Sequence, residues 1–155
     1  MRSYLAFATW SFLAGVGIPL IGVLNSGISR SVGNPFAATT ITFAVAMIVA
    51  AAITIPLHGV PTLAQLKAAP AIGYGAGLLI GFYALSATVI IPRFGAASFI
   101  AFILIAQLVG STLIDQFGLF GMTRRPVDIL RVSGLIVIVI GIALMEAANL
   151  RKASA

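Results

Sequence analysis

The sequence has no cysteine, a single histidine (His58) and only three acidic residues, which are Asp115, Asp128 and Glu146. The absence of cysteine excludes disulfides, thiol catalysis and cysteine-based metal sites. One imidazole and three scattered carboxylates lack metal-ligand spacing, so we expect no metal and no cofactor. Paired carboxylates, a Ser/His arrangement and a phosphate-binding motif are also missing, and we therefore expect that the chain is not an enzyme.

Charge of either sign is scarce. Only 8% of the 155 residues are charged and 61% are hydrophobic, whereas roughly a quarter of a soluble protein is charged. The mean hydropathy is +1.16, and such a surface must face lipid. The net charge of +6 is carried by basic residues that occur singly or in pairs between apolar runs. This placement is typical of membrane-end anchors, so we expect no nucleic-acid partner.

Five apolar segments are long enough to cross a bilayer, because a core of about 30 Å requires about 20 helical residues. Charged residues, prolines and glycines separate them. We predict an all-α integral membrane protein, with one membrane domain over residues 1–155 and five transmembrane helices at about residues 4–25, 35–57, 70–91, 95–117 and 129–149. The polar connection at 59–69 contains Gln65 and Lys67 and is predicted to include a short interfacial helix.

The distribution of basic residues leaves the orientation nearly unspecified. Five spans put the termini on opposite sides of the membrane, so basic residues can be assigned to each side. The N-terminal side has five (Arg2, Lys67, Arg124, Arg125, Arg131) and the other side has four (Arg30, Arg93, Arg151, Lys152). This balance predicts one of two outcomes. Either a weakly biased chain inserts one way, or the chain pairs with itself or with a paralogous five-helix chain in the opposite orientation, as in the inverted repeats of many transporters.

Small residues form a stripe on the third span. Gly73, Gly77 and Gly81 are spaced at i, i+4 and i+8, so they share one helix face and allow another backbone to approach closely. Gly15 and Gly22 repeat the pattern at heptad spacing on the first span. The stripe predicts helix packing, either within the chain or at a dimer interface.

Polar residues inside the membrane are costly and are candidates for function. Gln107 lies about 18 Å beyond Gly95 along a helix, which is near the bilayer midplane. Ser111 and Asp115 continue the same face at i+4 and i+8. We interpret this stripe either as a substrate-facing surface or as a ladder of interhelical hydrogen bonds.

Three further polar residues have two interpretations each. Tyr83, in the middle of the third span, can present its hydroxyl to a cavity or bond a neighbouring backbone carbonyl. Asn25 and Asn34 lie near predicted helix ends, where asparagine is a common capping residue. Contact with a ligand is the alternative for both, and Asn25 is the one that we include in the candidate substrate site.

Two carboxylates are candidates for coupling to a proton or cation, Asp115 and Glu146. The uncharged stretch at 132–145 is only about 21 Å long as a helix, so Arg131 or Glu146 must lie at the membrane edge. Snorkelling of these end residues is the alternative to a coupling role.

Short motifs are spread over almost the whole chain. They are NSG at 25–27, GNPF at 33–36, GFY at 81–83, PRFG at 92–95, and DQFGLFG at 115–121 followed by RRP. Together with Gln107 and Ser111, they resemble the YdcZ-type family of five-helix proteins in the drug/metabolite transporter (DMT) superfamily. Many members have histidine where this chain has Gln116. The resemblance implies a prokaryotic, multi-pass protein of the cell inner membrane that is one DMT-like half of a ten-helix antiparallel carrier.

The main functional hypothesis is a secondary carrier or exporter of a small molecule, working in the lipid bilayer as an antiparallel dimer. Its midplane site would include Gln107, Tyr83, Asn25 and Ser111. The alternative is a non-transporting assembly or regulatory subunit of a partner membrane protein, which fits the many packing glycines and the few polar groups within the membrane.

Overall fold

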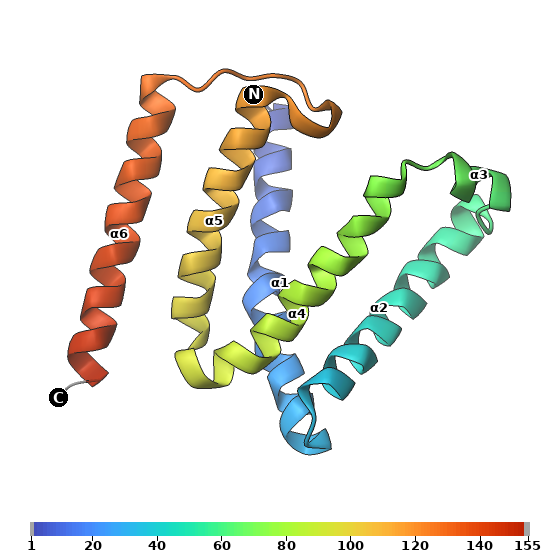
Figure 1. Cartoon of the computed structure of the whole chain (residues 1–155), viewed down its shortest axis with the longest axis horizontal. Coiled ribbons are helices and arrows are strands. Elements are labelled where there is room, and N and C mark those ends of the chain that lie inside the picture. The colour runs from blue at the N-terminus through green and yellow to red at the C-terminus, as the bar shows by residue number, and fades with distance from the viewer. Residues whose placement is uncertain (1, 154–155) are drawn as a thin grey trace. The chain divides into compact units, whose positions relative to one another are not determined.

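The structure is a computed structural model that describes residues 2–153, and the side chains of residues 4–151. The side chains of Arg2 and Lys152, which enter the charge count, lie outside this part. The element order is α1 (Arg2–Val32), α2 (Pro35–His58), α3 (Leu63–Ala68), the 3-10 helix η1 (Ala71–Tyr74), α4 (Gly75–Phe94), α5 (Ala96–Phe117), the 3-10 helix η2 (Leu119–Gly121) and α6 (Ile129–Ala153) (Figure 1). No strand occurs among the described residues.

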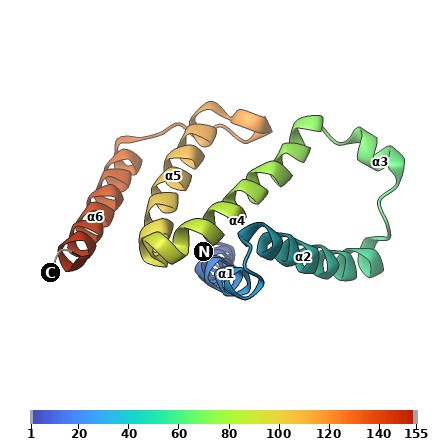
Figure 2. The same cartoon turned by 60° about the horizontal axis from the view of Figure 1, so that its bottom comes forward.

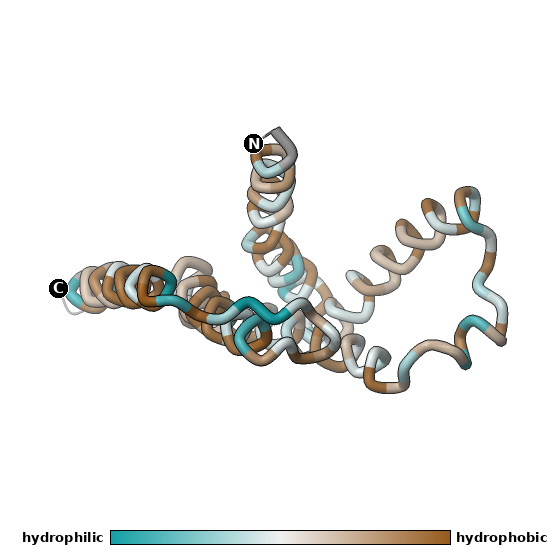
Figure 3. Tube along the Cα trace, turned by 90° about the horizontal axis from the view of Figure 1, so that it is seen from above, coloured by the Kyte–Doolittle hydropathy of each residue, from teal (hydrophilic) through white to brown (hydrophobic). Residues whose placement is uncertain are grey.

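Five helical segments of the described chain are long and apolar enough to cross a membrane. They are α1, α2, η1 with α4, α5, and α6. Their large apolar side chains point outward, and Trp10 and Leu78, for example, are both 79% exposed. Figure 3 shows hydrophobic residues along the helices and hydrophilic residues gathered in the connection between α5 and α6. Helices with this surface satisfy their own backbone hydrogen bonds and can face hydrocarbon. The predicted all-α protein with five membrane-spanning helices is confirmed.

Local signals set the connection from α1 to α2. Gly33 has φ +74, a conformation that glycine adopts at little cost. Asn34 then caps α2 as predicted, because its Oδ1 accepts hydrogen bonds from the backbone N–H of Phe36 at 2.8 Å and of Ala37 at 3.3 Å. Pro35 occupies the first turn of the helix, where its missing N–H costs nothing.

The predicted short helix between the second and third spans is present as α3. Thr62 and Gln65 form a capping box at its start. Thr62 Oγ1 accepts from the Gln65 backbone N–H at 3.3 Å, and Gln65 Oε1 accepts from the Thr62 backbone N–H at 2.8 Å. These reciprocal bonds satisfy two donors that a helix start otherwise leaves unpaired.

The chain forms two compact units, residues 1–96 and residues 97–155. In the first unit, α1, α2 and α4 pack on one another. They meet around the connection between α1 and α2 and diverge away from it (Figures 1 and 2). The buried residues of this unit lie at that junction, which we call the three-helix junction. They include the polar residues Asn25, Ser26, Thr39 and Thr88.

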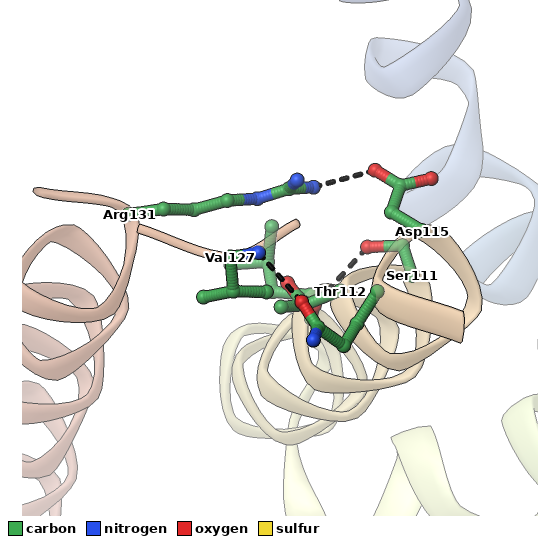
Figure 4. A network of polar contacts seen from close by, with 7 residues as sticks. Ser111, Thr112, Asp115, Val127 and Arg131 are labelled. Carbon is green, nitrogen blue, oxygen red and sulfur yellow. Dashed lines mark hydrogen bonds and ion pairs between the residues drawn. The ribbon is translucent and has the colours of Figure 1, made fainter. Parts of the chain in front are cut away.

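In the second unit, polar bonds near both ends link α5 to α6. Arg131 Nη2 lies 2.6 Å from Asp115 Oδ2 near one end (Figure 4). Asn149 Nδ2 donates to Ser98 Oγ at 3.4 Å near the other. Because two helices can be held at both ends without close packing between, α5 and α6 keep large faces open.

Close packing in the first unit depends on Gly22. A Cβ atom added there would clash with Ile91 Cδ1 and would lie 3.6 Å from Ala87 Cβ. At Gly15, one heptad earlier on the same helix, an added Cβ would meet no atom within 4 Å. Only one of these two glycines is therefore required for packing of α1 against α4.

We predict that Gly22→Leu lowers the free energy of unfolding by about 1–3 kcal/mol, because the added side chain overpacks the contact with Ile91. Gly15→Leu is the matched control and should have little effect within one chain. Thermal unfolding of the purified protein in detergent measures both. Equal melting temperatures for the two variants would contradict the α1–α4 contact at Gly22.

Candidate functional site

The three-helix junction is built around the amide of Asn25. This side chain is 2% exposed. Its Nδ2 donates to Thr39 Oγ1 of α2 at 3.2 Å and, by a short bond, to Thr88 Oγ1 of α4. Its Oδ1 accepts from Thr42 Oγ1 of α2 at 2.7 Å. One amide therefore uses both of its donors and its acceptor to join three helices.

The surrounding hydroxyls complete this network. Thr39 Oγ1 donates to Pro35 O at 3.0 Å, and Thr88 Oγ1 donates to Ala84 O at 2.8 Å. Ser26 Oγ donates to Gly22 O at 2.8 Å. No buried side-chain polar atom in the described part of the chain lacks a partner. All hydrogen bonds of the network are therefore made without a ligand. This matters because an unpaired polar group is costly where the dielectric constant is low.

Asn25 is therefore neither a helix cap nor the last residue of the first span. The helix continues past the predicted end of that span, because α1 runs to Val32. The helix continues because the polar groups of Asn25 and Ser26 are satisfied inside the protein and do not need the membrane surface.

An apolar cavity lies beside the junction, among α1, α2 and α4. Its volume is about 360 Å³, and it is lined by Ile21, Thr42, Phe43, Val45, Ala46, Ile80, Tyr83 and Ala84. Thr42 and Tyr83 contribute only apolar surface to this wall, and the hydroxyl of Thr42 is bonded to Asn25. We call this space the midplane cavity, because its depth, derived next, places it there.

The depth follows from helix rise. Ile21, Thr42 and Tyr83 lie about 12–15 Å along their helices from the end marked by Arg30, Asn34 and Arg93, and half of a hydrocarbon core is about 15 Å. By the same measure, the Asn25 network lies about 7 Å from that end. The network is thus located between the midplane cavity and one membrane surface.

The predicted stripe on α5 is present, but its residues have different surroundings. Gln107, in the middle of α5, is exposed, and its side chain has no hydrogen-bond partner among the described residues. Ser111 Oγ donates to Leu108 O at 3.1 Å within its own helix. Asp115 is 31% exposed and is bound by Arg131, as Figure 4 shows. The structure does not join these three residues into one ladder of interhelical bonds.

Gln116, next to Asp115, orders the connection to α6. Its Oε1 accepts from the Val127 backbone N–H at 2.6 Å, and its backbone O accepts from Arg124 Nε at 3.1 Å. Gln116 therefore has a structural role that needs no titratable ring.

The remaining predicted residues lie outside the three-helix junction and the stripe on α5. Glu146 is half-buried on α6 and accepts from Asn149 Nδ2 at 3.2 Å. Gly77 and Gly81 face open space, since an added Cβ would meet no atom within 4 Å, and an added Cβ at Gly73 would meet only Pro70. Among the described residues, no group of His, Cys, Asp and Glu could hold a metal ion.

Sequence reasoning missed Thr39, Thr42 and Thr88. Two signals were available. Thr39 and Thr42 are three residues apart and so share one face of a helix, and Thr88 lies one turn before the Pro92–Arg93 end of α4. Membrane helices use such hydroxyls for interhelical hydrogen bonds.

The fold and the cavity define a multi-pass α-helical membrane protein with a small, partly open apolar cavity among its first helices. The family described as "Putative inner membrane exporter, YdcZ" matches residues 6–144. The chain belongs to this family, and the predicted resemblance is confirmed. It is therefore a multi-pass inner-membrane protein of a family whose name describes exporters, not a class of enzymes. No curated protein and no solved structure matches the chain.

We predict that Thr39→Val destabilises the protein by about 0.5–1.5 kcal/mol, because an Asn25 donor loses its acceptor within the membrane. Thr40→Val is the matched control. Thr40 Oγ1 also donates to a carbonyl one turn back, Phe36 O at 3.0 Å, but it is exposed and has no contact with Asn25. Unfolding in mixed detergent measures both variants, and a larger effect for Thr40→Val would be inconsistent with the network.

Proposed function

We propose that this chain is a secondary exporter of a small neutral molecule and that it works as an antiparallel dimer of five-helix chains. The observation that carries the proposal is the midplane cavity. Its volume of about 360 Å³ lies at the lower end of the range for small-molecule sites. Its depth is the one at which carriers bind their substrates.

The wall of the cavity indicates the class of substrate. Six of its eight lining residues are aliphatic or aromatic, and the surface that the wall exposes is entirely apolar. No charged residue lines it, so nothing compensates the cost of moving an ion into it. We infer a small, neutral and mainly apolar molecule.

The Asn25 network supports alternating access. It lies between the midplane cavity and the membrane surface near Arg30, and it ties α2 to α1 and α4. A path to that surface opens only if these bonds break and α2 separates from the other two helices. Hydrogen bonds of this kind contribute about 1 kcal/mol each in membranes, a cost that thermal motion can meet.

Gln107 supports a second chain. An amide at the middle of a span that is exposed and unpaired is costly in hydrocarbon. A partner chain packed on α5 would satisfy it. The open faces at Gly77 and Gly81 permit close approach of another helix on α4.

Access to the cavity can be tested without knowing the substrate, because the chain has no native cysteine. We predict that Ala46→Cys, in the cavity wall, reacts with a charged methanethiosulfonate reagent in proteoliposomes. Thiolates form only where water reaches the sulfur. Ala44→Cys, on the same helix but outside the cavity wall, is the matched control and should stay unreacted.

The network provides the second arm of this test. Asn25→Ala combined with Ala46→Cys should speed labelling about fivefold or more, because loss of about 1 kcal/mol raises the open population by that factor. If Ala46→Cys stays unreacted in both backgrounds, water does not reach the cavity. The chain would then be better described as a non-transporting subunit.

Orientation is tested with a single cysteine in α3. We predict that Ala64→Cys is labelled to about one half in intact cells by a membrane-impermeant thiol reagent, because the basic residues of the two sides are nearly balanced. Ser31→Cys, near the other end of the same unit, should give the complementary fraction. Complete labelling at one site and none at the other would mean one orientation, and an antiparallel assembly would then need a paralogous chain.

A further inference from the structure

A second cavity lies at the outer end of the three-helix junction, where α1 ends, α2 begins and α4 ends. Its volume is about 300 Å³, and it is lined by Ser29, Arg30, Gly33, Pro35, Thr88, Val89, Pro92 and Arg93. Thr88, whose hydroxyl is bonded to Asn25, forms part of its inner wall. We call this space the arginine cavity.

Two positive charges at this cavity lack a counter-ion. The side chains of Arg30 and Arg93 form no hydrogen bond and no ion pair within the described part of the chain. Residues 1–96 contain no aspartate or glutamate at all, so the first unit cannot supply a carboxylate. Both arginines are exposed, and two guanidinium groups beside one cavity repel each other. An anion from outside this unit would remove that repulsion.

We propose that the arginine cavity binds one phosphate-type oxyanion, held jointly by Arg30 and Arg93. The planar fork of arginine matches two oxygens of a phosphate group. The hydroxyl of Ser29, on the same wall, is a further donor. The start of α2 does not substitute for the arginines, because Asn34 already accepts from its Phe36 and Ala37 N–H groups.

The anion has two possible sources with the same chemistry. It is either the headgroup of an anionic phospholipid in the adjacent leaflet or a phosphate group in solution. The proposal is independent of the export proposal, because it concerns a different cavity with a different lining.

Each arginine by itself has an ordinary explanation. Arginine anchors the end of a membrane span, and a cation is also favourable near the last carbonyls of a helix. These explanations treat Arg30 and Arg93 as independent, whereas a shared anion couples them. The decisive quantity is therefore the coupling between the two substitutions.

The test measures the melting temperature of the purified full chain in a neutral detergent, as a function of added phosphatidylglycerol or inorganic phosphate. Phosphatidylcholine with the same acyl chains and chloride at equal ionic strength are the reference additions. We expect phosphatidylglycerol to raise the melting temperature of the wild-type chain. Phosphate, added in a separate sample, either raises it as well or has no effect. Arg30→Gln and Arg93→Gln should each weaken the apparent affinity about tenfold or more, because each removes a charge-assisted bond. The double variant should bind the anion about as weakly as the single variant with the lower affinity.

Lys67→Gln is the matched control, since it removes one positive charge from the same unit at an exposed position on α3. It should leave the stabilisation unchanged. If the glutamine variants do not fold, Arg30→Lys and Arg93→Lys retain the charge but lose the fork, and each should still weaken binding several-fold.

The outcomes separate the sources and the alternatives. Stabilisation by phosphatidylglycerol but not by phosphate assigns the site to a lipid headgroup, and stabilisation by both assigns it to a phosphate group from either source. Additive losses from the two arginines, or an equal loss in Lys67→Gln, would overturn the shared site. The shared site would also be overturned if phosphatidylglycerol changed the melting temperature no more than phosphatidylcholine did, and phosphate no more than chloride.

Discussion

The first unit depends on one buried amide. Asn25 joins α1 to α2 and α4 through three hydroxyl groups, and its own bonds are complete. Lipid provides no hydrophobic force between helices, so small residues and hydrogen bonds have to hold them together. At this junction both occur one turn apart on α1, with Gly22 against Ile91 and Asn25 against the threonines. The position of Asn25 thus fixes where the three helices meet, and the two cavities lie on either side of that point.

The same network gives the two cavities different chemistry. Thr42 and Thr88 are both bonded to Asn25, but Thr42 faces the apolar midplane cavity and Thr88 the arginine cavity. A neutral, mainly apolar molecule suits the inner space, and an anion suits the outer one, because only the outer wall has cations. A change in the Asn25 bonds therefore alters a residue in the wall of each cavity at the same time. This is a physical route for coupling between the two cavities.

Local signals predicted much of the fold. The start of α2 follows from Asn34 and Pro35, and the start of α5 follows Gly95, whose φ is +90. The end of α1 was missed because NSG at 25–27 resembles a polar membrane end. The partners that keep it helical, Thr39 and Thr88, are 14 and 63 residues away. The sequence placed Tyr83 at the depth of the cavity that it lines. A single sequence could not show that Thr42 and Thr88 both bond the amide of Asn25.

The two membrane amides of this chain, Asn25 and Gln107, make opposite demands. The hydrogen bonds of Asn25 are complete within its own unit, so this side chain needs no partner from another molecule. Gln107 is exposed and unpaired within the described residues, and hydrocarbon offers it no partner. In the antiparallel dimer that we propose, contact of a second chain with α5 meets the demand of Gln107 for a hydrogen-bond partner. A second five-helix chain meets that demand permanently, whereas a transported molecule would meet it only while bound.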